Sequence, residues 1–425
     1  MQPNEPKRHG LPYGRGSVTL SLPSRDRQGA GAWLLRILCG LAGSVVLART
    51  QPEQLAKIKS AVTEKLSRLP NYTCTETVQR SQHAKVDRQD RLMMEETIRM
   101  EVAYVDGKEL FGWPGVAKID ESDIHKMIDG SIGNGYFALL SHSIFATSFA
   151  TIQYGNDSEL EGKPAVRYDY RIPKSSGAYT ITGEVGQAVV DFHGSFWVNP
   201  EALDLRRITA SVDNPPPLLG VKSADSILDF DRQSIGGSIF VLPRKAELKV
   251  VDADGTENLS LLSFASCHQF VGESVIKFDM AADESSSRAI AKPAAAPIAL
   301  PDDFTVDFNL DSPIEWGVAA GGDPVHGTLR DNVHQGGRVA APKGAGLSGR
   351  ISHVAMRGDL YYVELVFTSI EFQGGRADLT GRRNGIAVKD APLIFTSSKF
   401  KLDRGARLTL HSRLLKSLRN DSTRP

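Results

Sequence analysis

Residues 166–172 read Val-Arg-Tyr-Asp-Tyr-Arg-Ile, a stretch in which apolar or aromatic side chains alternate with charged ones. Successive side chains of a β-strand point to opposite faces, so this alternation is typical of a strand with one buried and one solvent-facing side. Residues 98–104, from Ile98 to Tyr104, show the same period of two. Both stretches favour a sheet that packs one face onto a core.

Further strand-like runs follow at short intervals and are separated by turn residues such as Asp252–Gly255. They predict strands at residues 189–198, 204–212, 226–231, 238–242, 246–251, 259–265 and 275–279. Consecutive strands that are joined by short turns form antiparallel meanders. The sequence therefore predicts a mainly β protein of the α+β kind, with an antiparallel sheet and only a few helices.

Three helices are expected before the meander. Residues 51–69 carry apolar side chains three and four positions apart, with Pro52 at the start and Pro70 beyond the end. This spacing predicts an amphipathic helix with one apolar face. That face consists of Leu55, Ile58, Val62, Leu66 and Leu69. Shorter helices are predicted at residues 119–127 and 136–149.

The composition of the chain changes after residue 280. Residues 281–301 read AADESSSRAIAKPAAAPIALP, which is rich in Ala, Ser and Pro and has no hydrophobic period. Such a segment is typical of an exposed linker. It separates a first domain at residues 49–280 from a second β-rich domain at residues 302–425. Two domains suit a chain of this length.

Residues 37–48 read ILCGLAGSVVLA, an uncharged run that follows several arginines and ends on small side chains. This order predicts a secretory signal peptide over residues 1–48. As a helix the run would be about 18 Å long, whereas a membrane core is about 30 Å thick, so an uncleaved anchor is the less favoured alternative. The protein is therefore expected in the periplasm or secreted, with no stable membrane span after cleavage.

Removal of residues 1–48 leaves two cysteines, Cys74 and Cys267. In an oxidising compartment a single pair most simply forms a disulfide, and two buried free thiols are the alternative. The whole chain has 50 basic and 50 acidic residues; without the six basic and two acidic residues of positions 1–48, 44 and 48 remain. Because the resulting charge of −4 is small and no basic stripe is present, nucleic acid is not an expected partner.

Two motifs in the first domain point to a known group of proteins. They are Tyr104-Val-Asp-Gly-Lys-Glu-Leu-Phe111 and the Trp-bearing strand, turn and strand of Gly194–Ile208. Together with the order of helices and strands, residues 50–280 resemble the LolA-like superfamily of outer-membrane lipoprotein carriers and their regulatory relatives. The resemblance implies a strongly curved antiparallel sheet with helices across its concave side, enclosing an apolar cavity. The cysteine pair is not part of the carrier pattern, which indicates a divergent member.

Two shorter resemblances complete the pattern. Leu69–Cys74 looks like a segment of exported soil-bacterial proteins of unknown function. Gly322–Leu329, followed by Val339–Ile351, is similar to the periplasmic β-barrel of TrbI-type conjugation-channel proteins. This second similarity covers about residues 310–352, and the channel elements of that family are absent from it. It implies a small β-barrel-like fold for the second domain.

The sequence contains none of the common motifs of catalytic or phosphate-binding sites. His-Glu-x-x-His, Cys-x-x-Cys, Gly-x-Ser-x-Gly and the phosphate loop are all missing. An enzyme is therefore the less favoured class, and a hydrolase with a dispersed site is the weakest alternative. No cofactor or metal is expected, because Asp120, Glu121, Asp123 and His125 are interpreted as a solvated helix start. Similarly, Gly130–Gly135 is interpreted as a turn, and the neighbours Ser141 and His142 cannot form a dyad.

Aromatic side chains gather in the first domain, where an ordinary core is the favoured interpretation. The carrier resemblance implies instead that some of them line a partly open cavity. The candidate ligand-binding residues are Phe111, Trp113, Tyr168, Tyr170 and Trp197. The leading hypothesis is an exported cell-envelope binding protein for an apolar or acylated ligand, a lipoprotein or another envelope protein. The alternative is a structural or protein-interaction module whose side chains fill the cavity.

Overall fold

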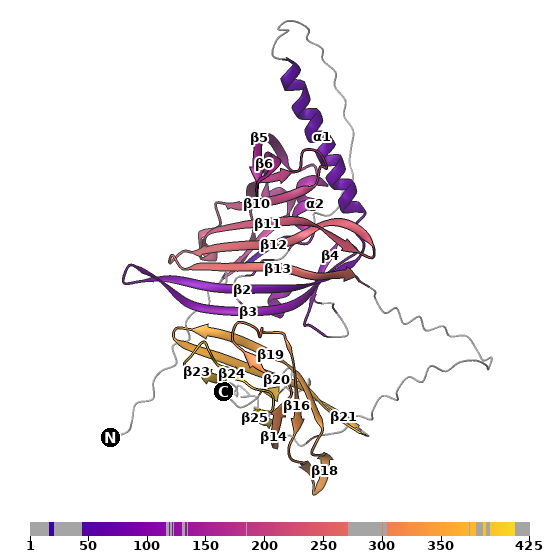
Figure 1. Ribbon diagram of the computed structural model, residues 1–425. Coiled ribbons are helices and arrows are strands. Elements are labelled where there is room, and N and C mark those ends of the chain that lie inside the picture. The colour runs from indigo at the N-terminus through magenta and orange to yellow at the C-terminus, as the bar shows by residue number, and fades with distance from the viewer. Residues whose placement is uncertain are drawn as a thin grey trace, which may run out of the picture. The chain divides into compact units, whose positions relative to one another are not determined.

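The computed structural model divides the chain into two compact units (Figure 1). It describes residues 17–20, 45–115, 119, 121, 123–129, 132–133, 135–183, 185–270, 300, 304–373, 375–379, 386–387 and 392–412. Unit 1 comprises Met1–Met93, Glu101–Gly112 and Ala117–Val271. Unit 2 comprises Met94–Met100, Trp113–Val116 and Gly272–Pro425. Each unit has its own hydrophobic core.

Unit 1 is built on a large antiparallel sheet with the strand order β5–β6–β9–β10–β11–β12–β13–β2–β3–β4. Figure 1 shows β10 to β3 side by side in this order. Among the described strands, β5 and β4 are the edges, so this sheet is not closed into a barrel. The bounds are β2 (Tyr72–Val86), β3 (Gln89–Val105), β4 (Lys108–Gly112), β5 (Thr151–Leu160), β6 (Lys163–Ile172), β9 (Asp191–Val198), β10 (Leu205–Asp213), β11 (Val221–Ile235), β12 (Ser238–Asp252) and β13 (Glu257–Gln269).

Two α-helices and a small sheet accompany the large sheet. The helices are α1 (Val45–Ser67) and α2 (Leu139–Phe145), and the 3₁₀ turns are η1 (Ile124–Lys126), η2 (Lys174–Ser176) and η3 (Pro217–Leu219). The small sheet joins β1 (Ser17–Leu20), β7 (Tyr179–Gly183) and β8 (Gly186–Val189). The Thr63 hydroxyl donates to the Phe145 carbonyl at 3.2 Å, which ties α1 to α2.

The predicted fold class is confirmed, because the protein is mainly β with few helices. The alternation in β6 holds: Val166, Tyr168, Tyr170 and Ile172 are buried, whereas the charged residues between them are more exposed. The strands predicted at 238–242 and 246–251 are one continuous strand, β12. The predicted break contains Pro243, which lies at a register shift between β11 and β12. Proline lacks an N–H, and this is tolerated at such an irregularity, so the strand continues through it.

The predicted helices differ from the observed ones in length. The first helix begins at Val45 rather than at Gln51, so that Pro52 lies inside it. The helix predicted at 119–127 is only the 3₁₀ turn η1, where the Asp123 carboxylate accepts a hydrogen bond from the His125 N–H. The helix predicted at 136–149 is reduced to the seven residues of α2. In both cases the local sequence predicted a longer helix than the structure forms. Contacts with the rest of the fold, and not helix propensity alone, determine where these short helices end.

The predicted disulfide is present between Cys74 on β2 and Cys267 on β13. Pairing of β2 with β13 brings the two residues together, and the Cα atoms are 4.1 Å apart. The register shifts between Ala265 and His268, and Ser266 between them has a φ of 53°. This bulge turns Cys267 towards Cys74, and the bond joins two strands 193 residues apart in the sequence.

Unit 2 is a smaller arrangement of antiparallel strands. β14, β16, β19 and β20 pair in this order; β14 also pairs with β25 and β20 with β22, and β22 contacts β25. The bounds are β14 (Phe304–Leu310), β15 (Ile314–Glu315), β16 (Pro324–Leu329), β17 (Val333–Gln335), β18 (Arg338–Ala341), β19 (Gly346–Arg357), β20 (Leu360–Phe372), β21 (Gly375–Asp378), β22 (Ile386–Ala387), β23 (Leu393–Phe395), β24 (Lys401–Leu402) and β25 (Arg407–Ser412). The β-rich character predicted for this part of the chain is confirmed, and its barrel-like form remains a prediction.

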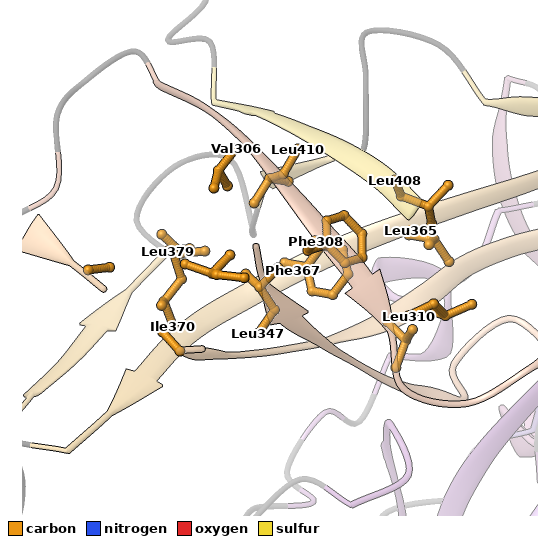
Figure 2. Packing of buried hydrophobic residues seen from close by; sticks show 14 of the residues in the cluster. Val306, Phe308, Leu310, Leu347, Leu365, Phe367, Ile370, Leu379, Leu408 and Leu410 are labelled. Atoms are coloured by element: carbon orange, nitrogen blue, oxygen red, sulfur yellow. The ribbon is translucent and has the colours of Figure 1, made fainter. Parts of the chain in front are cut away.

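The core of unit 2 is filled by large side chains (Figure 2). Phe308 and Phe367 are fully buried, and their rings meet edge to face with centroids 5.0 Å apart. Leu347, Leu365 and Leu410 pack in the same cluster.

Residues 94–100 of β3 belong to unit 2 and make polar contacts with other residues of that unit. The buried Glu96 carboxylate lies 2.9 Å from His353 Nδ1, and Arg99 forms an ion pair with Asp323. The hydrogen bond with Glu96 is the main cause that raises the pKa of His353. Trp113 also belongs to this unit, and the Arg350 guanidinium lies over its ring at 5.1 Å.

Three predictions concern segments that lie wholly or mostly outside the described residues. Of the predicted linker at 281–301, only Leu300 is described, and the strand predicted at 275–279 is not described. Of the predicted signal peptide, residues 1–16 and 21–44 lie outside the described part. The signal peptide and the domain boundaries therefore remain predictions. No helix within the described residues is both long and apolar enough to cross a membrane.

Candidate functional site: a cavity beneath helix α1

A cavity of about 500 Å³ lies in unit 1 between the two helices and the strands. A volume of this size falls within the range of small-molecule sites. Ten of its fifteen lining residues are apolar: Val62, Leu66, Leu69, Ala202, Leu205, Phe137, Phe230, Ile239, Phe240 and Val241. The other five are Lys65, Arg68, Ser141, Asp204 and Arg232. The cavity is therefore an apolar space with a few polar groups.

The apolar face of α1 forms one wall of the cavity. Val62 is buried, and Leu66 and Leu69 are half-buried where they line it. These three residues belong to the stripe that the three- and four-residue spacing predicts. Ile58, one turn earlier, is fully buried and holds the helix in place. The sequence pattern thus identified the wall, although not the empty space beside it.

A polar cluster lies along the turn between β9 and β10. Lys65 Nζ donates to the carbonyl oxygens of Ala202 at 2.8 Å and Leu203 at 3.1 Å, and to Asp204 Oδ1 at 2.7 Å. Arg232 Nε donates to the other carboxylate oxygen of Asp204 at 2.7 Å. Asp204 is buried, whereas the two cationic side chains are partly exposed to solvent. One carboxylate therefore holds two cations beside the cavity.

Ser141 on α2 is the polar residue that the cavity leaves unsatisfied. Its side chain is buried, and its Oγ has no hydrogen-bond partner among the described residues. A buried hydroxyl normally has a partner, because leaving it without one costs about 1–3 kcal/mol. The position lies within the helix predicted at 136–149, but no sequence pattern indicated that Ser141 borders a cavity.

Two buried carboxyl groups lie elsewhere in unit 1. Burial is the main cause that raises the pKa of Glu76 to about 8, and the charge of Glu109 adds to it. Burial also raises the pKa of Glu109 to about 7, although its carboxylate accepts hydrogen bonds from the N–H groups of Gly135 at 2.6 Å and Phe137 at 2.9 Å. These bonds anchor the segment before α2, and so they position Phe137 in the cavity wall.

The five aromatic residues that the sequence singled out do not line this cavity. Phe111, Tyr168 and Tyr170 are buried, and Tyr168 stacks on Phe196 with centroids 5.3 Å apart. Trp197 is half-buried, and the Arg167 guanidinium lies 5.8 Å from its ring centroid. Trp113 is half-buried in unit 2. Their role in ligand binding remains a prediction.

The acidic segment before η1 makes local contacts. The Glu121 carboxylate accepts hydrogen bonds from the Asp123 N–H and from Lys126 Nζ, while Asp120 lies outside the described residues. Burial lowers the pKa of His125. Within the described part of the chain, no group of three or more His, Cys, Asp or Glu side chains is placed to hold a metal ion.

Comparison with known proteins gives faint structural similarities. No family model and no curated protein matches the chain. Among solved structures, a Vibrio parahaemolyticus domain assigned as an outer membrane lipoprotein-sorting protein is 8% identical, with 49% of this chain and 90% of that chain covered and a TM-score of 0.24. A Desulfovibrio piger DUF1329 family protein is 11% identical, with 52% and 94% covered and a TM-score of 0.25. The first belongs to the group that residues 50–280 resemble, but TM-scores this low assign neither fold nor function.

Proposed function

We propose that the protein is an exported cell-envelope binding protein, which holds an apolar or acylated ligand in the cavity beneath α1. The observation that supports this most directly is the cavity itself, whose lining is mostly apolar and whose volume is about 500 Å³. The cavity is partly open, so part of its apolar wall faces solvent. Binding an apolar chain would remove that surface from water, which is favourable.

The ligand would bind chiefly through desolvation of its apolar part. Transfer of apolar surface from water contributes about 25 cal/mol per Å², reduced by the cost of ordering the ligand. Export is supported by the signal-like run at residues 37–48 and by the Cys74–Cys267 disulfide, because such bonds persist mainly in oxidising compartments. The ligand is therefore expected among the lipids and acylated proteins of the envelope.

A cavity-filling variant tests this proposal. Leu66→Trp places a larger side chain at the wall, and it should abolish binding of the fluorescent apolar probe N-phenylnaphthylamine to the full-length protein. Leu261→Trp is the matched control, because Leu261 lies on β13, is exposed and does not line the cavity. It should bind the probe as the parent does.

The alternative function predicts a different result. If the first unit is a structural or protein-interaction module, the parent protein will not bind the probe. Equal loss of binding in both tryptophan variants would also contradict the proposed site. Circular dichroism of both variants shows whether a loss arises from unfolding.

A further inference from the structure

Ser141 and Ser143 occupy similar positions on α2 but have different hydrogen bonds. Both are 1% exposed. The Ser143 hydroxyl donates to the Leu139 carbonyl at 2.9 Å, four residues earlier. Ser141 is one of the lining residues, and its buried hydroxyl has no partner among the described residues. A ligand that brings an oxygen acceptor into the cavity would satisfy it.

The charged groups that line the cavity are mostly cationic. Three lining residues are cationic, namely Lys65, Arg68 and Arg232, whereas only Asp204 carries a carboxylate. Glu64, outside the lining, pairs with Arg68, so Lys65 and Arg232 share the one charge of Asp204. The cluster therefore retains a net positive charge. The three N–H donors of Lys65 already bind Ala202, Leu203 and Asp204. Arg232 contacts Asp204 through Nε and Nη2 and is partly exposed, so its remaining N–H groups can pair with an additional anion.

We propose that the ligand is an anionic amphiphile with an ester-linked acyl chain; this inference rests on the proposed function. The chain lies against the apolar wall of α1 and β12. The ester carbonyl accepts a hydrogen bond from Ser141, and the anionic headgroup pairs with Arg232, while Lys65 adds positive charge beside it. An apolar wall, a buried donor and a cationic cluster thus each contact one part of the same molecule.

Three lysophospholipids with the same chain length separate these contacts. Lysophosphatidylglycerol has an anionic headgroup and an ester, lysophosphatidylcholine has a zwitterionic headgroup and an ester, and the ether analogue of lysophosphatidylglycerol lacks the carbonyl. Each is used below its critical micelle concentration to displace N-phenylnaphthylamine from the full-length protein. The anionic ester should bind about tenfold more tightly than the zwitterionic ester at low salt. This preference should shrink as salt is added, because the cations are partly exposed.

Variants assign each preference to its residue. Ser141→Ala should remove the preference for the ester over the ether, whereas Ser143→Ala should keep it. The double variant Lys65→Gln/Arg232→Gln should remove the preference for the anionic headgroup. Arg207→Gln is its control, because Arg207 pairs with Asp229 on the same sheet and does not line the cavity.

The outcomes distinguish this inference from the proposed function. If the parent protein does not bind the apolar probe, the proposed function fails and the inference fails with it. If the parent binds the probe but the three lipids displace it equally, the cavity binds apolar ligands and the inference about their class is wrong. An ester preference that persists in Ser141→Ala would likewise overturn the assignment of the carbonyl contact.

Discussion

The two units are both made of antiparallel strands, but the side chains inside them are arranged differently. In unit 2, Phe308 and Phe367 meet in a hydrophobic core among buried leucines. In unit 1, the side of the sheet next to α1 keeps a cavity of about 500 Å³ and a hydroxyl without a partner. A filled core is expected where stability alone matters, while an incomplete one is typical of a binding site.

The largest difference between the units should follow from the disulfide, which lies wholly in unit 1. Cys74→Ser/Cys267→Ser releases a loop of 193 residues, and the chain-entropy model gives an upper loss of about 5 kcal/mol. Hydrogen exchange measured by mass spectrometry should show faster exchange in the strands of unit 1 and unchanged exchange in β14, β16 and β19. Faster exchange in both units would mean that they unfold as one body.

Aromatic truncations should separate a packed core from a cavity wall. Phe367→Ala in unit 2 should lower the free energy of unfolding by about 3–5 kcal/mol, because it removes a fully buried ring. Phe240→Ala in unit 1 should cost only about 1 kcal/mol, since that ring is half-buried and already borders empty space. Urea denaturation of the two variants measures both quantities. Equal losses would mean that the cavity is packed as tightly as the core of unit 2.

The sequence predicted the elements of unit 1 better than its interior. The stripe from Leu55 to Leu69 identified the face of α1 that packs inward, and the alternation from Val166 to Ile172 identified the buried face of β6. Periodicity shows that a side chain is covered, but it does not show whether packed atoms or an empty space cover it. For this reason the sequence could not show which aromatic residues line the cavity. The five aromatic residues proposed for ligand binding are not among the lining residues.

The residues of the site come together only through long-range pairing. Phe230 and Phe240 belong to the β11–β12 hairpin, Asp204 to a turn before β10, and Ser141 to a helix that sequence propensity made too long. No local spacing connects them. The disulfide was easier to predict, because an exported chain with two cysteines has only one intramolecular pairing available.

The buried carboxyl group of Glu76 should make the stability of unit 1 depend on pH. Its pKa is raised from 4.5 to about 8, chiefly by burial, so the folded state binds a proton that the unfolded state has released. The free energy of unfolding should therefore fall as the pH rises from about 4.5 to about 8. Glu76→Gln should remove much of this fall, on the order of a few kcal/mol, and be the more stable protein at pH 8.

Thermal unfolding between pH 4.5 and pH 8 measures this effect. Glu101→Gln provides a comparison on the same sheet, because Glu101 lies on β3 and is only half-buried. Its pH profile should follow that of the parent. A parent protein whose stability rises over this range would contradict the assignment of a protonated, buried Glu76.

The smallest expected effect compares the two serines of α2 in the absence of ligand. Ser141→Ala removes a buried hydroxyl that has no partner in the described structure, so it should raise the free energy of unfolding by about 1 kcal/mol. Ser143→Ala removes a hydroxyl that donates to Leu139, so it should lower the free energy by about 1 kcal/mol. Urea denaturation resolves changes of opposite sign even at this size. If Ser141→Ala is more stable and binds ester lipids less tightly, the Ser141 hydroxyl lowers the stability of unit 1 but contributes to ligand binding. If both substitutions are destabilising, the Ser141 hydroxyl has a hydrogen-bond partner without a ligand.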